Sequence, residues 1–278
     1  MGTTLQGLKL GYMGMDYGVL GYPNPNDMLL PGRTSMPRTW YRCPSLAYII
    51  NHPAGRILYD TGISTNFAEE WLPEWKATID LSELNEDVLL ENSLKQIGLG
   101  PDDFDYVILS HCHADHAGGL RIFEEAGAQI VLHEDEHRYA TNIWSADNFF
   151  VRKDWNFISR RNPTLMYGDQ EIFEDLWTIS LPGHTPGSMG VLVRLETTGW
   201  ALLAGDAVST HDAFGPPPIP NFVNTSNEDF LNSCGKVEQI ASELDAFIFP
   251  GHDESGMQYS QGELAIKPVE FMPGHTYE

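Results

Sequence analysis

Short apolar runs dominate the chain, and most of them are too short to form a helix. Apolar runs of this kind, bounded by glycine, proline, asparagine or aspartate, indicate β-strands. The expected strands lie at residues 8–15, 45–51, 56–59, 106–109, 128–133, 176–181, 191–195, 200–204 and 247–249. Strands are therefore expected along most of the chain.

A smaller number of stretches show helical spacing. In residues 84–97, apolar side chains recur every three to four positions, and Gly98 stands where a glycine commonly ends a helix. Further helices are expected at residues 120–126, 134–141 and 227–244. Strands and helices thus alternate, which fits an α+β fold.

Two segments interrupt this alternation. Residues 1–45 are rich in Gly, Pro, Tyr and Met, and residues 18–37 within them are expected to form a long loop, either a wall of a substrate pocket or a surface excursion. Residues 142–167 are aromatic and irregular, and we expect them to cover a site, to form an oligomer contact or to form core helices. No repeat or linker is visible, so residues 1–278 are predicted to form a single domain.

The net charge of the chain indicates which classes of partner it can bind. Its 39 acidic and 16 basic residues give a net charge of −23. Nucleic acids and anionic membranes are bound by basic surfaces, so neither is expected as a partner. A hydrophobic content of 42% over 278 residues is ample for a sizeable core.

The cysteines and the N-terminus indicate a compartment. Cys43, Cys112 and Cys234 are far apart and odd in number, which is typical of a reducing environment. Residues 1–10 lack the pattern of a secretory signal, and no apolar run approaches the roughly 20 residues that span a bilayer. We therefore expect a cytoplasmic protein.

The densest cluster of metal-binding side chains directly follows the fourth expected strand. It reads Ser-His-Cys-His-Ala-Asp-His-Ala-Gly-Gly and contains His111, His113, Asp115 and His116. Imidazole nitrogens and a carboxylate suit zinc and related divalent metals. Two histidines two positions apart can face one metal, and the adjacent Asp115 and His116 can turn to a second. Cys112 alternates with the histidines and is expected to pack in the interior.

Other strands also end in polar side chains. His184, Asp206 and His252 each follow an apolar run and lie next to glycine, which lets the backbone approach closely. Asp60 ends a further strand, and we expect its carboxylate to hydrogen-bond a metal-binding histidine. Three such strand ends beside the histidine-rich turn indicate a metal centre.

These motifs resemble the signature of the metallo-β-lactamase superfamily, over roughly residues 45–255 and in the family's order. The resemblance implies a four-layer αβ/βα sandwich, with two mixed sheets flanked by helices. It also implies two divalent metal ions, with zinc as the expected metal. One ion would be held by His111, His113 and His184, the other by Asp115, His116 and His252, and Asp206 would bridge them.

The same resemblance implies a hydrolase. A hydroxide bridging two metals, formed at neutral pH, would attack a carbonyl, and Asp115 would orient it and carry a proton. The motifs Pro-Gly-His-Thr-Pro-Gly-Ser, Gly-Asp-Ala and Pro-Gly-His-Asp are most similar to the N-acyl-homoserine lactonase branch. The expected substrate is a small neutral lactone, with N-acyl homoserine lactones among the candidates.

One position departs from that branch. Its members carry a tyrosine three residues after the bridging aspartate, where this chain has Ser209, whose side chain is too short for the same reach. We expect Ser209 to lie at the substrate, and His211, or Tyr22 from the early loop, to contact the substrate in place of the missing tyrosine.

Other activities stay open. A cyclic amide, such as a γ- or β-lactam, is the main alternative, because the same hydroxide attacks either carbonyl. A glyoxalase-type thioesterase, a redox enzyme using iron and a non-catalytic binding protein on this fold are further alternatives. The assembly that we consider is a homodimer.

Overall fold

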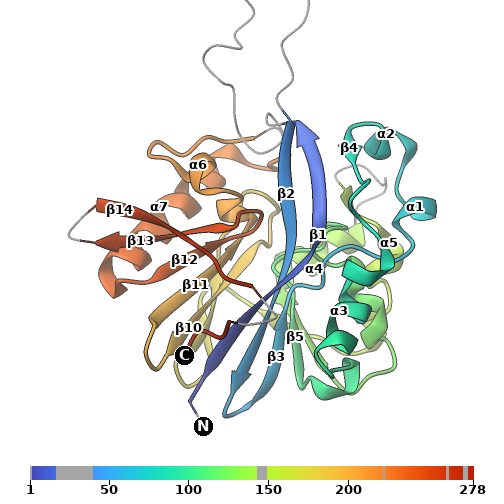
Figure 1. The fold of residues 1–278 in the computed structure, drawn as a ribbon, viewed down its shortest axis with the longest axis horizontal. Coiled ribbons are helices and arrows are strands. Elements are labelled where there is room, and N and C mark those ends of the chain that lie inside the picture. Colours follow the sequence, from blue (N-terminus) through green and yellow to red (C-terminus); the bar gives the residue numbers. More distant parts are fainter. Residues whose placement is uncertain (1, 17–39, 143–148, 222, 261–262, 272–274) are drawn as a thin grey trace, which may run out of the picture.

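Two seven-stranded sheets form the centre of the protein (Figure 1). The computed structural model describes residues 2–16, 40–142, 149–221, 223–260, 263–271 and 275–278. In spatial order the first sheet contains β4 (Ile79–Asp80), β1 (Thr4–Asp16), β2 (Trp40–His52), β3 (Gly55–Tyr59), β5 (Tyr106–Ile108), β6 (Gln129–His133) and β7 (Thr164–Met166). The second contains β14 (Glu263–Pro268), β13 (Ser255–Ser260), β12 (Phe247–Pro250), β11 (Gly199–Gly205), β10 (Met189–Leu195), β9 (Leu176–Ser180) and β8 (Gln170–Phe173).

Helices cover the outer faces of both sheets. On the side of the first sheet lie α1 (Phe67–Glu70), α2 (Pro73–Lys76), α3 (Leu90–Gln96), α4 (Glu134–Asn142) and α5 (Arg152–Trp155) (Figure 1). On the side of the second lie α6 (His211–Phe214) and α7 (Asn227–Leu244). Short 3₁₀ helices span Glu86–Val88, Pro101–Asp103, Gly118–Phe123, Ile158–Arg160 and Asp206–Val208. The order helix, sheet, sheet, helix confirms the predicted αβ/βα sandwich.

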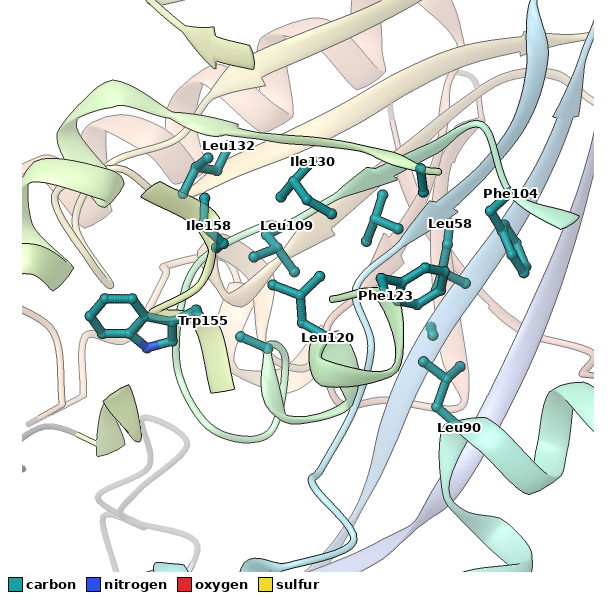
Figure 2. Packing of buried hydrophobic residues seen from close by; sticks show 14 of the residues in the cluster. Leu58, Leu90, Phe104, Leu109, Leu120, Phe123, Ile130, Leu132, Trp155 and Ile158 are labelled. Carbon is teal, nitrogen blue, oxygen red and sulfur yellow. The ribbon is translucent and has the colours of Figure 1, made fainter. Parts of the chain in front are cut away.

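The alternation of side chains along the strands explains the layers. In β3, Ile57 and Tyr59 pack between the two sheets, whereas Leu58 points to the outer face. Because both faces of these strands are buried, they are apolar throughout rather than alternating with polar residues. Figure 2 shows the outer cluster of the first sheet, in which Leu58 and Leu109 lie near Leu120 and Phe123.

The strand directions bring several loops to one edge. Strands β3, β5, β6 and β7 are mutually parallel, and so are β11 and β12. Parallel neighbours end at the same edge of a sheet. Strand β9 runs in the same direction as β11, because both are antiparallel to β10. The loops that follow β3, β5, β9, β11 and β12 therefore lie at one edge, and they carry Asp60 and the metal-binding residues expected from the sequence.

All nine expected strands are present, with ends shifted by a few residues. The helix at residues 227–244 is also confirmed as α7. The Ser226 hydroxyl accepts a hydrogen bond from the Asp229 amide at its start, and Asp245 ends it with a left-handed backbone. The sequence reading missed the short strands β4, β7 and β8 and the C-terminal hairpin of β13 and β14.

Two predicted α-helices are formed wholly or partly as 3₁₀ helix. Residues 84–97 split into a 3₁₀ turn and α3, because Asn85 accepts from the Asp87 amide and the buried Leu89 is extended. Gly98 does follow this helix with a positive φ of 77°. The expected helix at 120–126 is instead a 3₁₀ helix from Gly118 to Phe123.

The two irregular segments are only partly described. The loop expected at 18–37, with Tyr22, lies outside the described residues, as do residues 143–148. Within the described part of 142–167, Phe150, Trp155, Phe157 and Ile158 join the core cluster of the first sheet. Among the described residues, no helix is long and apolar enough to pass through a membrane.

Candidate metal centre

The histidine-rich turn after β5 is held against the end of β3. The amide and the hydroxyl of Thr61 both donate to the His116 carbonyl, at 2.7 Å. Gly119 packs so closely that a Cβ there would lie 2.2 Å from the Thr61 carbonyl oxygen. A larger residue would push the two loops apart, so the Gly-Gly pair sets the position of the turn.

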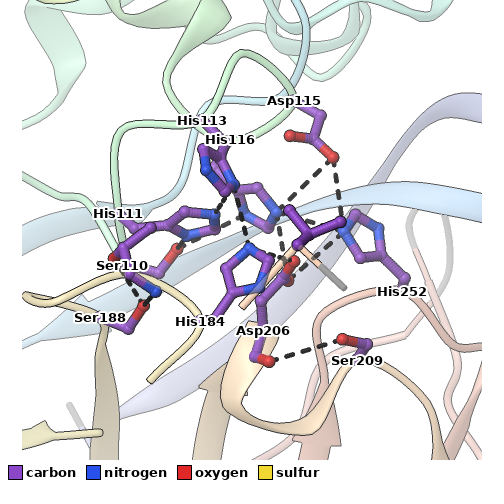
Figure 3. Close-up of polar contacts among 12 residues, drawn as sticks. Ser110, His111, His113, Asp115, His116, His184, Ser188, Asp206, Ser209 and His252 are labelled. Carbon is purple, nitrogen blue, oxygen red and sulfur yellow. Dashed lines mark hydrogen bonds and ion pairs between the residues drawn. The ribbon is translucent and has the colours of Figure 1, made fainter. Parts of the chain in front are cut away.

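One group of donor atoms comes from three histidines. His113 Nδ1 lies 3.0 Å from His111 Nε2 and 3.0 Å from His184 Nε2 (Figure 3). Asp206 Oδ2 lies 3.2 Å from His184 Nε2. His184 follows β9 and Asp206 follows β11, so strands of the second sheet complete the group that the turn begins.

A second group shares the same aspartate. His116 Nε2 and His252 Nε2 lie 3.2 Å apart, and Asp206 Oδ1 lies 3.3 and 3.4 Å from them. Asp115 Oδ2 lies 3.5 Å from His252 Nε2. The two oxygens of Asp206 therefore face different groups of donors, as Figure 3 shows.

These positions fit two metal ions. Ligand atoms in tetrahedral coordination to zinc, at about 2.0–2.1 Å from the ion, lie roughly 3.3 Å from one another. The observed separations are close to this value. Asp206 Oδ1 is buried and accepts no hydrogen bond within the described part of the chain. Several lone pairs thus converge without enough protons between them, an arrangement that cations would stabilise.

Hydrogen bonds on the far side of the rings fix their orientation. Nδ1 of His116 lies 2.9 Å from Asp60 Oδ2, and Nδ1 of His252 lies 2.9 Å from the Pro44 carbonyl oxygen. When Nδ1 donates these bonds, Nε2 keeps its lone pair for a metal. His111 is held in the same way, since its Nδ1 lies 2.9 Å from Ser110 Oγ.

The structure places Asp60 beneath the turn. Its carboxylate accepts from the amide and the hydroxyl of Ser110, both at 2.7 Å, in addition to its contact with His116. Asp60 is buried and has a φ of 59°, a region that non-glycine residues seldom adopt. Such local strain is typical of residues whose side chain is needed in one direction.

Burial and charge shift the titration of the cluster. Burial and the neighbouring imidazoles hold the pKa of His111 well below its usual range. For His116, burial alone would lower the pKa, but the carboxylates of Asp206, Asp115 and Asp60 raise it well above its usual range. Burial opposes ionisation of Asp206, yet His252, His116 and His184 hold its pKa well below the usual range. Asp206 is therefore an anion.

Glu136 is a buried residue that the sequence reading missed. Its carboxylate accepts from the Cys112 amide at 2.8 Å, the Thr185 hydroxyl at 2.6 Å and the Gly187 amide at 3.3 Å. Cys112 lies between two histidines of the turn, and Thr185 follows His184. Glu136 thus joins the loops of the two sheets, and burial raises its pKa to about 7.

The Glu136 signal was hidden in the polar helix 134–141, where an acidic residue is ordinarily exposed. His133 at the start of this helix is also buried, and its ring nitrogens contact the Asp135 and Gly168 amides. Cys112 is buried in the core cluster, as expected.

A pocket opens above the donor cluster. Its walls come from β1, the α1–β4 region, the described end of the aromatic segment and the loop before α7. The apolar lining residues include Met13, Met15, Trp71, Ile79, Phe149 and Val223. The polar lining residues are His113, Asp115, His184, Asp206, Ser209, Asn221 and His252.

The three residues expected at the substrate lie in different surroundings. Ser209 is buried and lines the pocket, and its hydroxyl lies 3.5 Å from the Asp206 carbonyl oxygen. His211 is not among the described lining residues. Its Nδ1 lies 2.5 Å from Asp253 Oδ2 and its Nε2 lies 3.1 Å from Asp212 Oδ1, so carboxylates occupy both ring nitrogens. Tyr22 falls outside the described residues.

Curated proteins of known activity are similar over most of the chain. The N-acyl homoserine lactonase AttM of Agrobacterium fabrum is 32% identical over 225 residues, covering 77% of this chain and 83% of AttM. The N-acyl homoserine lactonase AiiA of Bacillus thuringiensis subsp. kurstaki is 27% identical over 251 residues, covering 88% and 93% of the two chains.

Solved structures and a family model agree with this similarity. An N-acyl homoserine lactone hydrolase, with the product N-hexanoyl-L-homoserine at its catalytic metal centre, superposes with a TM-score of 0.75 at 25% identity. The match covers 91% of this chain and 94% of that one. Residues 40–252 match the model of the metallo-β-lactamase superfamily. The chain therefore belongs to the metallo-β-lactamase superfamily, as a hydrolase whose curated relatives are lactonases.

Proposed function

We propose that the protein is a dinuclear metal-dependent lactonase that opens small, neutral lactone rings. The observation that carries this proposal is the pair of donor groups that share Asp206, one oxygen to each group, at the floor of a largely apolar pocket. The activity of the curated relatives supports ring-ester hydrolysis as the reaction.

The donors divide between two ions. His111, His113 and His184 would hold one, whereas Asp115, His116 and His252 would hold the other. Asp206 would bridge them. Zinc is the metal that best suits this set of imidazole and carboxylate donors. Two such ions, when bound, supply a water molecule of lowered pKa and polarise the ester carbonyl.

The protein side chains have separate tasks in this reaction. Asp115 is the least buried of the donors, with 18% of its side chain exposed, so it can exchange a proton with solvent after accepting one at its free oxygen. Asp60 keeps His116 oriented, as described above. Met13, Met15, Trp71 and Phe149 exclude water from the ring and favour an apolar substituent.

The walls of the pocket favour neutral substituents. None of the described lining residues is a lysine or an arginine, so the side chains offer no cationic partner away from the proposed metal ions. The remote carboxylates of a glutathione thioester would lack such a partner there. A lactone carries no charge and requires none.

The test is a pH-stat assay of metal-loaded protein against γ-lactones, N-acyl homoserine lactones, γ-lactams and β-lactams. Acid release from the lactones at rates far above those for the lactams is the expected result. Turnover confined to the lactams would reassign the enzyme as a cyclic amidase. Absence of turnover on the entire panel, with two metals bound, would reject the proposal.

A further inference from the structure

We propose that Arg121 is a positioning residue for the hydrolytic reaction. Its guanidinium group binds Glu70 and Asp154, and it thereby holds two separate segments of the aromatic pocket wall over the donor cluster. This role rests on the proposed lactonase function. Arg121 acts from outside the pocket, since it is not among the described residues that line it.

Arg121 lies close to the metal-binding turn in the sequence. It belongs to the 3₁₀ helix Gly118–Phe123, which directly continues the turn. The Ala117 amide donates to the His113 carbonyl at 2.8 Å, and the Leu120 amide donates to the Ala117 carbonyl at 3.0 Å. Hydrogen bonds thus connect the turn to the helix, so the place of the Arg121 side chain follows that of the donors.

The guanidinium group of Arg121 joins two helices that are distant in the sequence. Its Nη1 donates to Glu70 Oε1 in α1 at 3.1 Å, and its Nη2 contacts both Glu70 Oε2 and Asp154 Oδ1 in α5. Lys153 Nζ lies 3.3 Å from Glu70 Oε1, so α1 and α5 are neighbours on the outer side of the first sheet (Figure 1). One side chain therefore fixes both helices to the turn.

Both helices depend on contacts with the rest of the protein. α1 and α5 contain four residues each, and neither has a side chain that caps its N-terminus. None of the residues of α1 is buried. Because isolated helices shorter than about 12 residues are marginal in water, the position of α1 relies on anchors such as the ion pair of Glu70.

The two helices lead directly into the wall of the pocket. Trp71 follows Glu70 and lines the pocket, and Phe149 lines it shortly before α5 begins. Trp75 lies between them, with its ring centroid 6.3 Å from that of Trp71 and 4.9 Å from that of Phe149. Arg121 thus connects the two ends of one aromatic wall.

Phe149 also contacts the metal-binding turn itself. Its carbonyl accepts a hydrogen bond from the Ala114 amide, in the middle of the turn, at 2.9 Å. Phe149 has a φ of 63°, a value that bulky residues rarely adopt, so its backbone is strained and must be held by its surroundings. Asp154, a little further along the chain, supplies such an anchor through Arg121.

The chemistry of the bridge favours a role in geometry over a role in stability. Asp154 is fully buried, and Asp154 Oδ2 and Arg121 Nε have no hydrogen-bond partner within the described residues. Burial raises the pKa of Asp154 to about 7, although Arg121 opposes the rise. A buried ion pair with unsatisfied atoms contributes little to the free energy of unfolding, because the loss of hydration offsets the attraction between the charges.

A loosened wall should weaken substrate binding and leave the chemical step intact. When the binding-competent arrangement is present for only a fraction of the time, the apparent dissociation constant rises by the inverse of that fraction. The metal-binding histidines are oriented by other groups, namely Asp60, Ser110 and the Pro44 carbonyl. Loss of Arg121 should therefore raise KM and leave kcat nearly unchanged.

The experiment removes the bridge in two ways. Arg121→Met combined with Asp154→Leu takes away both buried charges together, so neither is left unpaired, and Glu70 keeps Lys153 as a partner. Glu70→Ala instead frees α1 alone and leaves Arg121 paired with Asp154.

The control is Arg161→Met, which removes an arginine from the same region. Arg161 donates to the carbonyls of Phe123 and Ala128, at 3.0 and 3.3 Å, and it is not among the described residues that line the pocket. Each protein is assayed at about pH 8, where Asp154 is ionised, with γ-decalactone, which carries an apolar chain, and with unsubstituted γ-butyrolactone. Metal content, thermal unfolding and amide hydrogen exchange are measured alongside.

In the double variant we expect KM for γ-decalactone to rise about fivefold or more, as a wall in place for about a fifth of the time requires. Glu70→Ala should raise it about threefold. In all variants kcat, metal content and KM for γ-butyrolactone should stay within about twofold of wild type. Amide exchange should accelerate at least about tenfold at residues 65–80 in both test variants, and at residues 149–156 in the double variant alone.

Wild-type KM and wild-type exchange in the double variant would overturn the proposal, and so would an equal rise in KM for γ-decalactone in Arg161→Met. An equal fall in kcat on both lactones would also overturn it, because it would indicate general loss of folded enzyme. If the double variant does not fold, the same comparison of Glu70→Ala with wild type decides. Lack of lactone turnover by the wild type would reject the proposed function, and the exchange rates would still show whether Arg121 holds the wall.

Discussion

The two halves of the molecule contribute to the donor cluster in different ways. The first half places His111, His113, Asp115 and His116 on one continuous turn after β5. The second half supplies its donors one at a time, from the ends of β9, β11 and β12. The first group is local in sequence, whereas the second exists only once the sheet has formed.

Hydrogen bonds between the two halves hold the site rigid. The local turn is fastened to the other half by the Met189 amide, which donates to the Ser110 carbonyl at 3.0 Å, and by the contact of Glu136 with Thr185. The bond between His252 Nδ1 and the Pro44 carbonyl crosses in the opposite direction. The donor cluster therefore lies between the two sheets and is held by both. Substitutions can distinguish residues that would bind metal from residues that only position the metal-binding side chains.

Asp206→Asn should have the largest effect, because Asp206 is the one donor that faces both groups. The amide keeps the shape but loses the charge and one of the two oxygens. We expect activity to fall by about 10³-fold or more, as loss of several kcal/mol of electrostatic stabilisation implies. Steady-state assays of lactone turnover measure this, with the exposed Asp245→Asn at the end of α7 as the matched control. Activity near wild type would mean that Asp206 bridges nothing.

Asp60→Asn tests a support within the first half. The new NH₂ group can face His116 Nδ1 and oppose its N–H, so the ring would lose its fixed tautomer. A loss of about 10- to 100-fold in metal affinity is expected, measured by competition with a chelating dye. Affinity equal to that of wild type would show that the ring is held by other contacts.

Glu136→Ala tests the link between the halves. It leaves the Cys112 and Gly187 amides buried without their acceptor, whereas the Thr185 hydroxyl keeps Ser188 Oγ as a partner. The free energy of unfolding should fall by about 2 kcal/mol, at about 1 kcal/mol for each amide. Urea unfolding measures the difference, and the exposed Glu125→Ala serves as the control. A change below about 0.5 kcal/mol would exclude Glu136 as a link.

The raised pKa of Glu136 should also make the stability of the protein depend on pH. Burial raises its pKa from 4.5 to about 7, so the folded protein binds a proton that the unfolded chain has released. Its contribution to stability is present below pH 4.5 and is lost as the pH rises toward about 7. The stability of wild type relative to Glu136→Gln should decrease over that interval. A constant difference would mean that Glu136 does not titrate there.

Ser209→Ala should have the smallest effect. The hydroxyl is 3.5 Å from its nearest acceptor, which is too long for a strong bond, and its reach into the pocket is short. We expect kcat and KM to stay within about twofold of wild type. A large fall in kcat, with metal still bound, would identify Ser209 as a proton donor and contradict the proposed roles.

The same contrast explains how far the sequence could predict the molecule. The strands could be predicted because their apolar runs are bounded by clear turn signals, and the turn after β5 was recognisable from residues close together in the chain. His184, Asp206 and His252 became candidates through strand ends and the family resemblance. Glu136 could not be predicted, because its role depends on groups of distant loops, at Cys112, Thr185 and Gly187. Likewise, the 3₁₀ helix at Gly118–Phe123 depends on close packing with the β3 loop.

The central claim is that two metal ions share Asp206 between the two halves. The most direct test is a count of metal per chain by plasma mass spectrometry, on protein purified without chelator and dialysed against zinc, for wild type and Asp206→Asn. We predict two ions per wild-type chain and fewer than two in the variant. One ion or none in the wild type, or two tightly bound ions in both proteins, would contradict the account.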